Sequence, residues 1–227
     1  MKKTVIIIQA RIGSKRLPCK MMLSLHGHPI IEWVVKRVQK ARLHDGIIVA
    51  IPDTEQNDPL AFFLAGIEAN VYRGKEEDVL NRFYEAAKSQ GASHIVRVCA
   101  DNPLISGKEI DNLIDFYGRT PCDYAYNHIP VGNNYPDGLG AEMVAFSLLE
   151  KLEYTVTEQR HREHCFSYIW DNPNQFVIKT FNPPNLRIHR PNLKLDIDTF
   201  EDYRRFALKD FSMGITDEEL VDLFGEG

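Results

Sequence analysis

Short apolar runs alternate with amphipathic segments along the first half of the chain. The β-branched run at residues 5–8 has no polar position, which is typical of a strand buried on both faces. Residues 30–38 instead have apolar side chains at helical spacing, and Pro29 precedes them, where a first helical turn accepts proline. This alternation predicts a mostly parallel sheet with helices on both faces. The same criteria predict strands at 46–51, 71–72 and 94–99, and helices from residue 58, over 76–90 and around 110–117.

The second half of the chain is less regular. A long loop, residues 128–140, is predicted between two strands, and loops of that length are usually functional or mobile. Thr199 with Asp202, and Thr216 with Glu219, have the spacing of a capping box, so each pair should begin a helix. No linker divides the chain, and residues 1–227 are predicted to form one domain. The remaining predictions are strands at 123–126, 142–146, 176–181 and 193–198, and a helix over 158–170.

Composition excludes several classes of protein. The 227 residues, 44% of them apolar and 26% charged, suffice for a core without disulfides. A net charge of −5 argues against a general nucleic-acid or membrane-surface binder, whose footprint would be basic. The four cysteines form no C-x-x-C pair, as expected of reduced thiols, and the apolar run at the N-terminus is too short for a signal peptide. We therefore expect a cytoplasmic protein that binds neither nucleic acid nor membrane.

A cluster of cations follows the first predicted strand within ten residues. It consists of Arg11, Lys15, Arg16 and Lys20. In open α/β sheets, ligands bind beyond the carboxyl ends of the strands, and Gly13 would let backbone N–H groups approach a phosphate, through a positive φ if needed. A basic loop is often merely solvated, but the buried strand before it favours a phosphate site. Neither the P-loop nor the dinucleotide motif fits, because both need more glycines, so side-chain cations would have to neutralise the phosphates.

Two aspartates stand at the ends of other predicted strands. Asp101 directly follows the run at 94–99, although an aspartate before Pro103 is also typical of a simple turn. Asp198 ends the run at 193–198, and Asp196, two positions earlier, would lie on the same face of that strand. Carboxylates at strand ends beside a phosphate loop suit Mg²⁺, which takes hard oxygen ligands together with substrate phosphates.

These segments resemble the spore-coat polysaccharide cytidylyltransferase-like family, which is related to CMP-Kdo and CMP-sialic acid synthetases. Residues 9–20 match its Q-A-R-x-G-S-x-R-L-P-G-K motif except at Cys19, where glycine is usual. Residues 97–105 match R-V-x-A-D-x-P-L-I, and residues 197–202 match V-D-T-P-E-D with Phe200 in place of the proline. Three further segments, 73–82, 135–142 and 162–164, resemble R-G-x-E-x-D-V-L-x-R, Y-P-D-G-L-D-x-E (with Gly140 for the second aspartate) and R-E-H.

The resemblance implies a three-layer α/β sandwich around a mostly parallel sheet, the nucleotide-diphospho-sugar transferase (glycosyltransferase-A-like) fold. It also implies a cytidylyltransferase reaction, in which an acceptor oxygen attacks the α-phosphorus of CTP and pyrophosphate leaves. Such transfer depends on positioning and charge neutralisation more than on covalent catalysis. The expected partners are CTP and a small sugar-like acceptor, acidic and destined for surface polysaccharide, with Mg²⁺ as cofactor. Whether the protein is a monomer or a homodimer is left open.

The resemblance also implies roles for individual residues. The catalytic residues would be Arg11, Arg16, Lys20 and Asp101. The nucleotide would contact Gln9, Ala10, Arg11, Gly13, Ser14, Arg16, Lys20, Arg73, Asp78, Arg82 and Cys99. The acceptor would contact Asp137, Gly138, Glu142, Arg162 and His164. Asp101 and Asp198 would be the metal ligands, and Asp196 either assists them or is only an exposed strand-end carboxylate.

Other functions remain open at this point. The nucleotide could be GTP or another triphosphate, and the acceptor a sugar phosphate or a phosphonate. A glycosyltransferase of the same fold uses a D-x-D motif, which Asp196 and Asp198 match superficially, but it leaves the N-terminal cations unexplained. A non-catalytic nucleotide-binding protein is disfavoured because both aspartates and the cations are present. A zinc site at His161, His164 and Cys165 lacks a second ligand pair at a recognised spacing.

Overall fold

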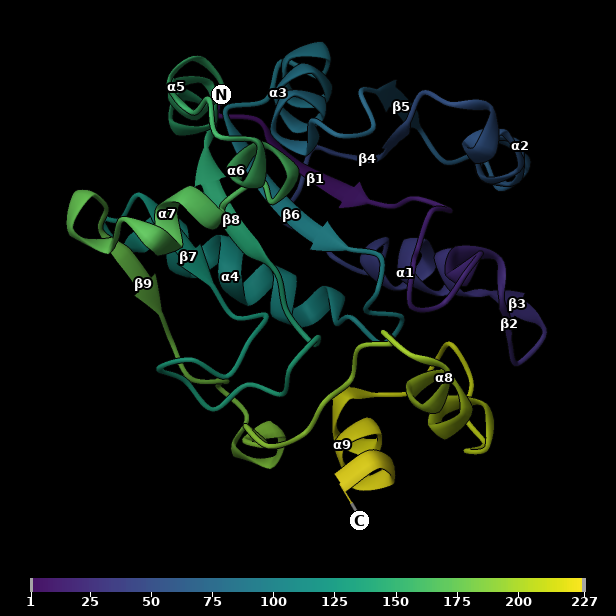
Figure 1. The fold of residues 1–227 in the computed structure, drawn as a ribbon. Helices are drawn as coiled ribbons and strands as arrows, with labels where there is room; N and C mark the ends of the chain where they lie inside the picture. The colour runs from purple at the N-terminus through teal and green to yellow at the C-terminus, as the bar shows by residue number, and fades with distance from the viewer. Residues whose placement is uncertain (1, 226–227) are drawn as a thin grey trace.

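A seven-stranded sheet forms the centre of the molecule (Figure 1), seen in a computed structural model that describes residues 2–225. The strand order is β5-β4-β1-β6-β8-β7-β9, and β8 alone runs against its neighbours. This arrangement confirms the predicted α/β class with a mostly parallel sheet. The strands are β1 (Thr4–Gln9), β4 (Gly46–Pro52), β5 (Val71–Gly74), β6 (His94–Cys99), β7 (Tyr124–Tyr126), β8 (Glu142–Ala145) and β9 (Ile178–Thr180).

Strand β1 lies in the middle of the parallel part, paired with β4 on one side and β6 on the other. Its apolar side chains have no solvent exposure, and they alternate between two separate core clusters. Ile6 and Ile8 pack into one cluster, whereas Val5 and Ile7 pack into the other. The prediction of a strand buried on both faces is therefore confirmed.

Helices cover both faces of the sheet (Figure 1). One face carries α1 (Ile30–Val38), α2 (Asp58–Gly66), α4 (Gly107–Arg119), α8 (Phe200–Ala207) and α9 (Asp217–Gly225). The other face carries α3 (Val79–Ser89), α5 (Phe146–Thr155), α6 (Gln159–Glu163) and α7 (Ser167–Asp171). Minor elements are the hairpin β2 (Ser24–Leu25) and β3 (His28–Pro29) and the 3₁₀ turns η1 (Lys20–Met22), η2 (Glu55–Asn57), η3 (Pro173–Gln175) and η4 (Leu186–Ile188).

The predicted helix starts and caps are largely confirmed. The capping box of α8 is present, because Thr199 and Asp202 each bond the other's backbone N–H. Thr216 and Glu219 do the same before α9. Helix α3 begins three residues later than predicted, at Val79, because the Asp78 side chain accepts a hydrogen bond from the N–H of Asn81 and caps it.

Two predictions in the second half are wrong, and one helix was missed. The strand predicted over 142–146 is present and ends at Ala145. Phe146 begins α5, a helix that was not predicted because no side chain caps its start. The helix predicted over 158–170 is two short helices, since the chain turns at residues 164–166 to bury Cys165 and Phe166.

The second wrong prediction concerns residues 193–198, which are extended but belong to no ladder. The Leu195 N–H bonds the carbonyl of Asp137 at 2.8 Å, and the Ile197 N–H bonds the carbonyl of Asp101 at 2.8 Å. The segment thus connects two different parts of the molecule instead of pairing with one strand. No helix among residues 2–225 is long and apolar enough to cross a membrane.

Candidate active site

The candidate site lies at the carboxyl ends of β1 and β6. Gln9 and Cys99, the last residues of these strands, are paired in register, so the loops that follow them leave the sheet side by side. The extended segment 193–198 joins them through the hydrogen bond between Ile197 and Asp101. The fold thus brings together three segments that are far apart in the sequence.

Lys20 is the central charge of this site. Its side chain is buried, with the residue 4% exposed, and its Nζ lies 2.7 Å from Oδ1 of Asp101 and 3.5 Å from Oδ1 of Asp198. It also donates a hydrogen bond to the carbonyl of Ile197 at 2.7 Å. A guanidinium nitrogen of Arg16 lies 2.9 Å from Asp198. The structure therefore brings together Arg16, Lys20 and the two predicted metal ligands.

The carboxylates of Asp101 and Asp198 fit a metal that is bound together with the nucleotide. Each offers hard oxygen atoms, and the Asp101 side chain is 44% exposed. Within residues 2–225, no group of three or more Asp, Glu, His or Cys side chains is placed to hold a metal ion. Mg²⁺ is commonly held by one or two carboxylates, with phosphate oxygens and water completing its shell. This donor set matches that arrangement and not an all-protein cage.

The loop between β1 and η1 is anchored by side chains. The Ile12 N–H bonds the buried Asn57 amide oxygen at 2.9 Å, and the Leu17 N–H bonds the Ser14 hydroxyl at 3.3 Å. The residue with a left-handed backbone is Cys19, with φ 53°, whereas Gly13 has no positive φ. The expectation that Gly13 supplies that conformation is thus not met. Cys19 stands where related motifs have glycine, and it keeps the backbone shape that glycine favours.

Arg82 supplies a second buried cation near this loop. Its side chain has no exposure, and one guanidinium nitrogen donates to the carbonyls of Lys75 and Glu76. Its Nε and its other terminal nitrogen have no hydrogen-bond partner among the described residues. Burial, and next the charge of nearby Arg11, lower the pKa of Arg82 to about 10. Arg11 and Arg82 are thus near enough to repel each other, and an anion bound between them would relieve that repulsion.

A network around Arg97 fills the space between β6 and α7, and this residue was missed as a site candidate. Its guanidinium lies between the rings of Phe83 and Phe166, at 6.0 Å from each centroid. It donates to Gln9 Oε1 at 3.1 Å and to the carboxylate of Glu142. A cation inside an otherwise apolar strand is the sequence signal that could have identified it.

Glu142 is buried within this network and does not open onto a binding surface. One of its oxygens accepts from Arg97 and the other from the Tyr124 hydroxyl. Although burial opposes ionisation, Arg97 lowers the pKa of Glu142 and keeps it charged. Burial raises the pKa of the neighbouring Cys99 thiol to about 11, so Cys99 is neutral at physiological pH. Glu142 therefore orients Arg97, while its contact with the acceptor stays a prediction.

Several predicted ligand-binding residues are occupied by structural contacts instead. Arg162 donates to Asp78, to the Glu153 carboxylate, and to the carbonyls of Glu153 and Val156, which uses all five of its N–H groups. Arg73 holds the loop after β4 through ion pairs to Asp53 and Asp58. Arg73, Asp78 and Arg162 thus stabilise the framework of the site, while their contacts with a ligand stay predictions.

The structure also shows where the three residues considered as a zinc site lie. His164 is exposed at the C-terminal end of α6. His161 is buried, with its Nδ1 2.8 Å from the Ser167 hydroxyl, and Cys165 is buried in the core beneath α7. Burial raises the pKa of the Cys165 thiol. The structure gives His161 and Cys165 packing roles, in keeping with the weak spacing signal for zinc.

The predicted acceptor segment packs against residues 193–198. Gly138 has φ +86°, and a Cβ there would lie 3.1 Å from Asn102 Oδ1 and from backbone atoms of residues 195–196, so glycine is required. A Cβ at Gly140 would lie 2.3 Å from Asn127. The aspartate that the family motif has at this position would therefore clash with Asn127 in this protein. Burial, and next the charge of Asp196, raise the pKa of Asp137 to about 6.

Comparison with known proteins agrees with this geometry. The chain matches the family model described as cytidylyltransferase over residues 5–215. This chain belongs to the cytidylyltransferase family. Spore coat polysaccharide biosynthesis protein SpsF of Bacillus subtilis is 31% identical over 208 residues, covering 89% of this chain and 84% of that protein. As a member of the family, this cytidylyltransferase is a nucleotidyl-transferring enzyme.

Solved structures show the same fold. A cytidylyltransferase from Leptospira borgpetersenii aligns with a TM-score of 0.88 at 28% identity, covering 100% of this chain and 95% of that one. A CMP:2-keto-3-deoxy-manno-octonic acid synthetase complexed with CTP aligns with a TM-score of 0.69 at 17% identity, covering 91% and 97%. The predicted nucleotidyltransferase fold is therefore confirmed for this cytidylyltransferase.

Proposed function

We propose that this protein transfers CMP from CTP to a sugar-like acceptor and releases pyrophosphate. The observation that carries the proposal is the convergence of Lys20, Asp101 and Asp198 where β1 and β6 end. Cations and hard-oxygen ligands at one strand edge are what a triphosphate with its metal needs. The Bacillus subtilis relative named for spore coat polysaccharide supports an acceptor destined for a surface polysaccharide.

The residues of the phosphate loop act by binding and orienting. Arg11, Arg16 and Lys20 hold the phosphates and stabilise the negative charge of the departing pyrophosphate, and the buried charge of Arg82 near Arg11 adds to the positive potential there. Asp101 and Asp198 would hold Mg²⁺, which when bound polarises the α-phosphate and neutralises its charge. The Ile12 and Leu17 anchors keep the loop in place, so that alignment of the nucleotide costs little at the moment of reaction.

The acceptor would lie beside Asp137, next to the proposed metal ligands. Gly138 lets the acceptor segment approach residues 195–196 closely, and Arg97 is held toward Gln9 by Glu142. Asp137 and Arg97 are the polar groups we assign to orienting the acceptor hydroxyls. An acidic sugar is proposed as the acceptor class, and a neutral sugar, a sugar phosphate or a phosphonate is the alternative outcome of the test below.

The structure favours this reaction over a glycosyltransferase reaction. In a D-x-D motif the two aspartates serve one metal site, but here Asp196 lies 3.4 Å from Lys194, whereas Asp198 lies beside Lys20 and Arg16. The two carboxylates therefore have different cationic partners. The cation-rich loop after the first strand also suits a triphosphate donor, whose three phosphates carry more negative charge than the diphosphate of a nucleotide sugar.

Phosphorus NMR of a set of parallel reactions tests the proposal. The mixture contains the protein, CTP, Mg²⁺ and either acidic sugars, neutral sugars or sugar phosphates. Parallel tubes contain GTP or UTP in place of CTP, or nucleotide sugars in place of any triphosphate, and one tube has no protein. We expect pyrophosphate and a CMP ester to appear in equal amounts with one acceptor class. Consumption of nucleotide sugars, with no reaction of any triphosphate, would overturn the proposal.

A further inference from the structure

A second concave surface lies away from the phosphate loop, between residues 189–194 and the helices α8 and α9. This cleft has a volume of about 570 Å³, which is within the usual range for small-molecule sites. Among residues 2–225, its walls contain four cations and no carboxylate. The cations are Arg190, Lys194, Arg205 and Lys209, and the apolar wall includes Leu193 and Phe224. None of these residues belongs to the loop that follows β1.

Most of this positive charge has no partner within the described part of the chain. Lys194 pairs with Asp196 and Asp202 at 3.4 Å, but no ion pair among residues 2–225 includes Arg190, Arg205 or Lys209. Lys209 donates to the carbonyl of Leu223, and Arg190 donates to the carbonyl of His189. The protein as a whole has a net charge of −5, so three such cations in one cleft are a local feature.

The acidic side chains of α9 do not neutralise the cleft, because they are paired elsewhere. Asp217 accepts from Ser106 and lies beside Arg37. Glu218 accepts from Asn185, and Asp222 pairs with Arg187. Glu219 accepts from the N–H of Thr216 at the start of the helix. The four carboxylates of α9 therefore have partners outside the cleft, and the wall formed by the described residues stays positive.

Arg205 is held in place before any ligand arrives. Its guanidinium lies 5.2 Å from the ring centroid of Phe206 and 5.8 Å from that of Phe224, and it donates to the carbonyl of Lys194. Its Nε is buried without a hydrogen-bond partner in the described residues. A guanidinium fixed by stacking loses little entropy when it binds an anion, and its planar donors suit phosphate oxygens.

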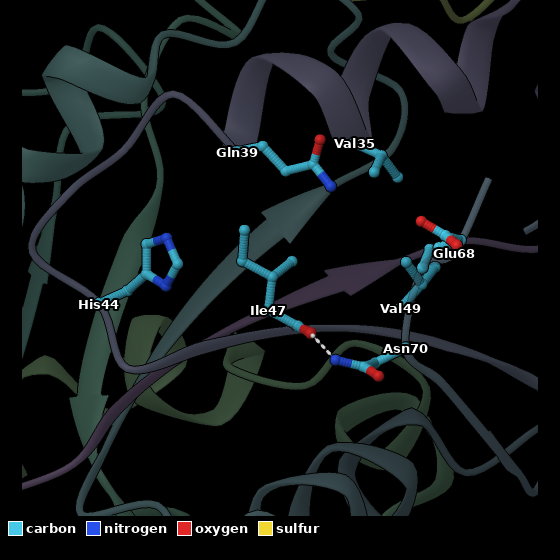
Figure 2. Close-up of a pocket in the computed structure, with 8 residues that line it drawn as sticks. Val35, Gln39, His44, Ile47, Val49, Glu68 and Asn70 are labelled. Carbon is cyan, nitrogen blue, oxygen red and sulfur yellow. Dashed lines mark hydrogen bonds between the residues drawn. The ribbon is translucent and has the colours of Figure 1, made fainter.

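The depression shown in Figure 2 provides a contrast. It measures about 130 Å³ and lies near the start of β4, at the edge of the sheet opposite the phosphate loop. Its polar lining consists of His44, Gln39 and Asn70 with one carboxylate, Glu68 (Figure 2). A small volume and a single charge specify no class of ligand, whereas the cleft beside α8 and α9 has several cations and room for a metabolite.

We propose that this cleft binds a phosphorylated small molecule through Arg190, Arg205 and Lys209. Three cations from different segments suit an anion with several charges on one group, which among metabolites describes a phosphate or diphosphate ester. The apolar remainder of the ligand lies on Leu193 and Phe224. The site is separate from the proposed CTP site, although Lys194 connects its wall to Asp196 and Asp202.

Calorimetric titration with inorganic pyrophosphate, at low salt and without divalent metal, tests the site without any turnover. Wild-type protein should show two classes of binding site, one in the phosphate loop and one in the cleft. The double variant Arg190→Ala/Lys209→Ala should weaken one class more than about ten-fold, and Arg16→Ala should weaken the other. The guanidinium of Arg190 bonds only the carbonyl of His189 within residues 2–225, so Arg190→Ala alone should weaken the same class as the double variant.

A matched control separates a built site from general positive charge. Lys151→Ala/Arg204→Ala removes the same charge from exposed positions on α5 and α8, and it should leave both classes intact. A wild type in which no class of site responds to Arg190→Ala/Lys209→Ala overturns the proposal, whatever the phosphate loop binds. So does an equal loss of affinity in the control variant and in the cleft variant.

Discussion

Two clusters of ion pairs contain residues of the family motifs, one around Lys20 and one around Arg162. They differ in how many of their hydrogen-bond donors and acceptors already have partners within the protein. The Lys20 cluster consists of Arg16, Lys20, Asp101 and Asp198. Within residues 2–225, each of its carboxylates uses one oxygen in an ion pair, and the Arg16 side chain is 65% exposed with one carboxylate partner. In the Arg162 cluster, every guanidinium N–H donates within the protein. A charged motif residue can act on a ligand only where donors or acceptors remain, so the first cluster is suited to substrate and the second to structure.

The largest effect is expected from the carboxylates of the Lys20 cluster. Asp101→Asn and Asp198→Asn each remove a charge that we assign to the metal, and turnover should fall by at least about a hundred-fold. Chelation of divalent metal should abolish activity, and Mg²⁺ should restore it. Pyrophosphate release is the measurement, with circular dichroism to confirm folding. Near-normal rates in either variant at ordinary Mg²⁺ concentrations would remove the metal assignment.

The cations of the same cluster should show a smaller effect on nucleotide binding. Arg16→Ala and Lys20→Ala each remove a charge-assisted contact worth about 1.5–3 kcal/mol, or roughly ten- to over a hundred-fold in affinity. Lys15→Ala is the matched control, because Lys15 is exposed and has no ion pair with Asp101 or Asp198. Calorimetric titration with CTP gives the order of the three variants. Lys15 as the most sensitive position would show that the loop is wrongly assigned.

The parallel half of the fold could be predicted because each element follows from local pattern. Val5 to Ile8 are apolar on both faces, and the helices have capping residues or proline at their starts. The second half could not be predicted as well, since its elements depend on distant partners. Residues 193–198 are extended because they bond Asp137 and Asp101, and no sequence pattern distinguishes that from a strand.

The residues of the candidate site could be predicted from the motifs, but their hydrogen-bond and ion-pair partners could not. The motifs named Lys20, Asp101 and Asp198, and the structure brings them together. They also named Arg162, whose N–H groups donate to Asp78, which is far from it in sequence, and to Glu153, which lies outside the motifs. Arg97 was missed because a single cation in a strand is weak as a signal until its partners Gln9 and Glu142 are known.

Disrupting the Arg162 cluster should lower the stability of the fold and leave substrate binding nearly unchanged. Arg162→Met removes partners from two largely buried carboxylates and two carbonyls, and should lower the free energy of unfolding by about 3 kcal/mol. The Michaelis constants for CTP and acceptor should change less than about three-fold, measured below the melting temperature. Arg160→Ala, an exposed ion-pair partner of Asp171, should cost under about 1 kcal/mol. A variant that keeps its stability but loses acceptor affinity would return Arg162 to the binding site.

The smallest expected effect concerns Asp137, a carboxylate beside the open cluster, in metal-free buffer. Its pKa is raised to about 6 by burial and by the charge of Asp196, whereas in the unfolded chain an aspartate titrates near 3.9. Between these values the folded state binds the additional proton. Its contribution to stability is therefore complete below about pH 4 and is lost as the pH rises through about 6.

Asp137→Asn cannot ionise, so this pH dependence should disappear in the variant. Urea denaturation at pH 5, 6 and 7 should show a steeper loss of stability with rising pH in the wild type than in Asp137→Asn. Asp222→Asn, at an exposed position paired with Arg187, makes the same charge change and should keep the wild-type slope. If Asp137→Asn also keeps that slope, the carboxylates of Asp137, Asp196 and Asp198 do not interact as their positions indicate, and the acceptor side of the open cluster must be assigned to other residues.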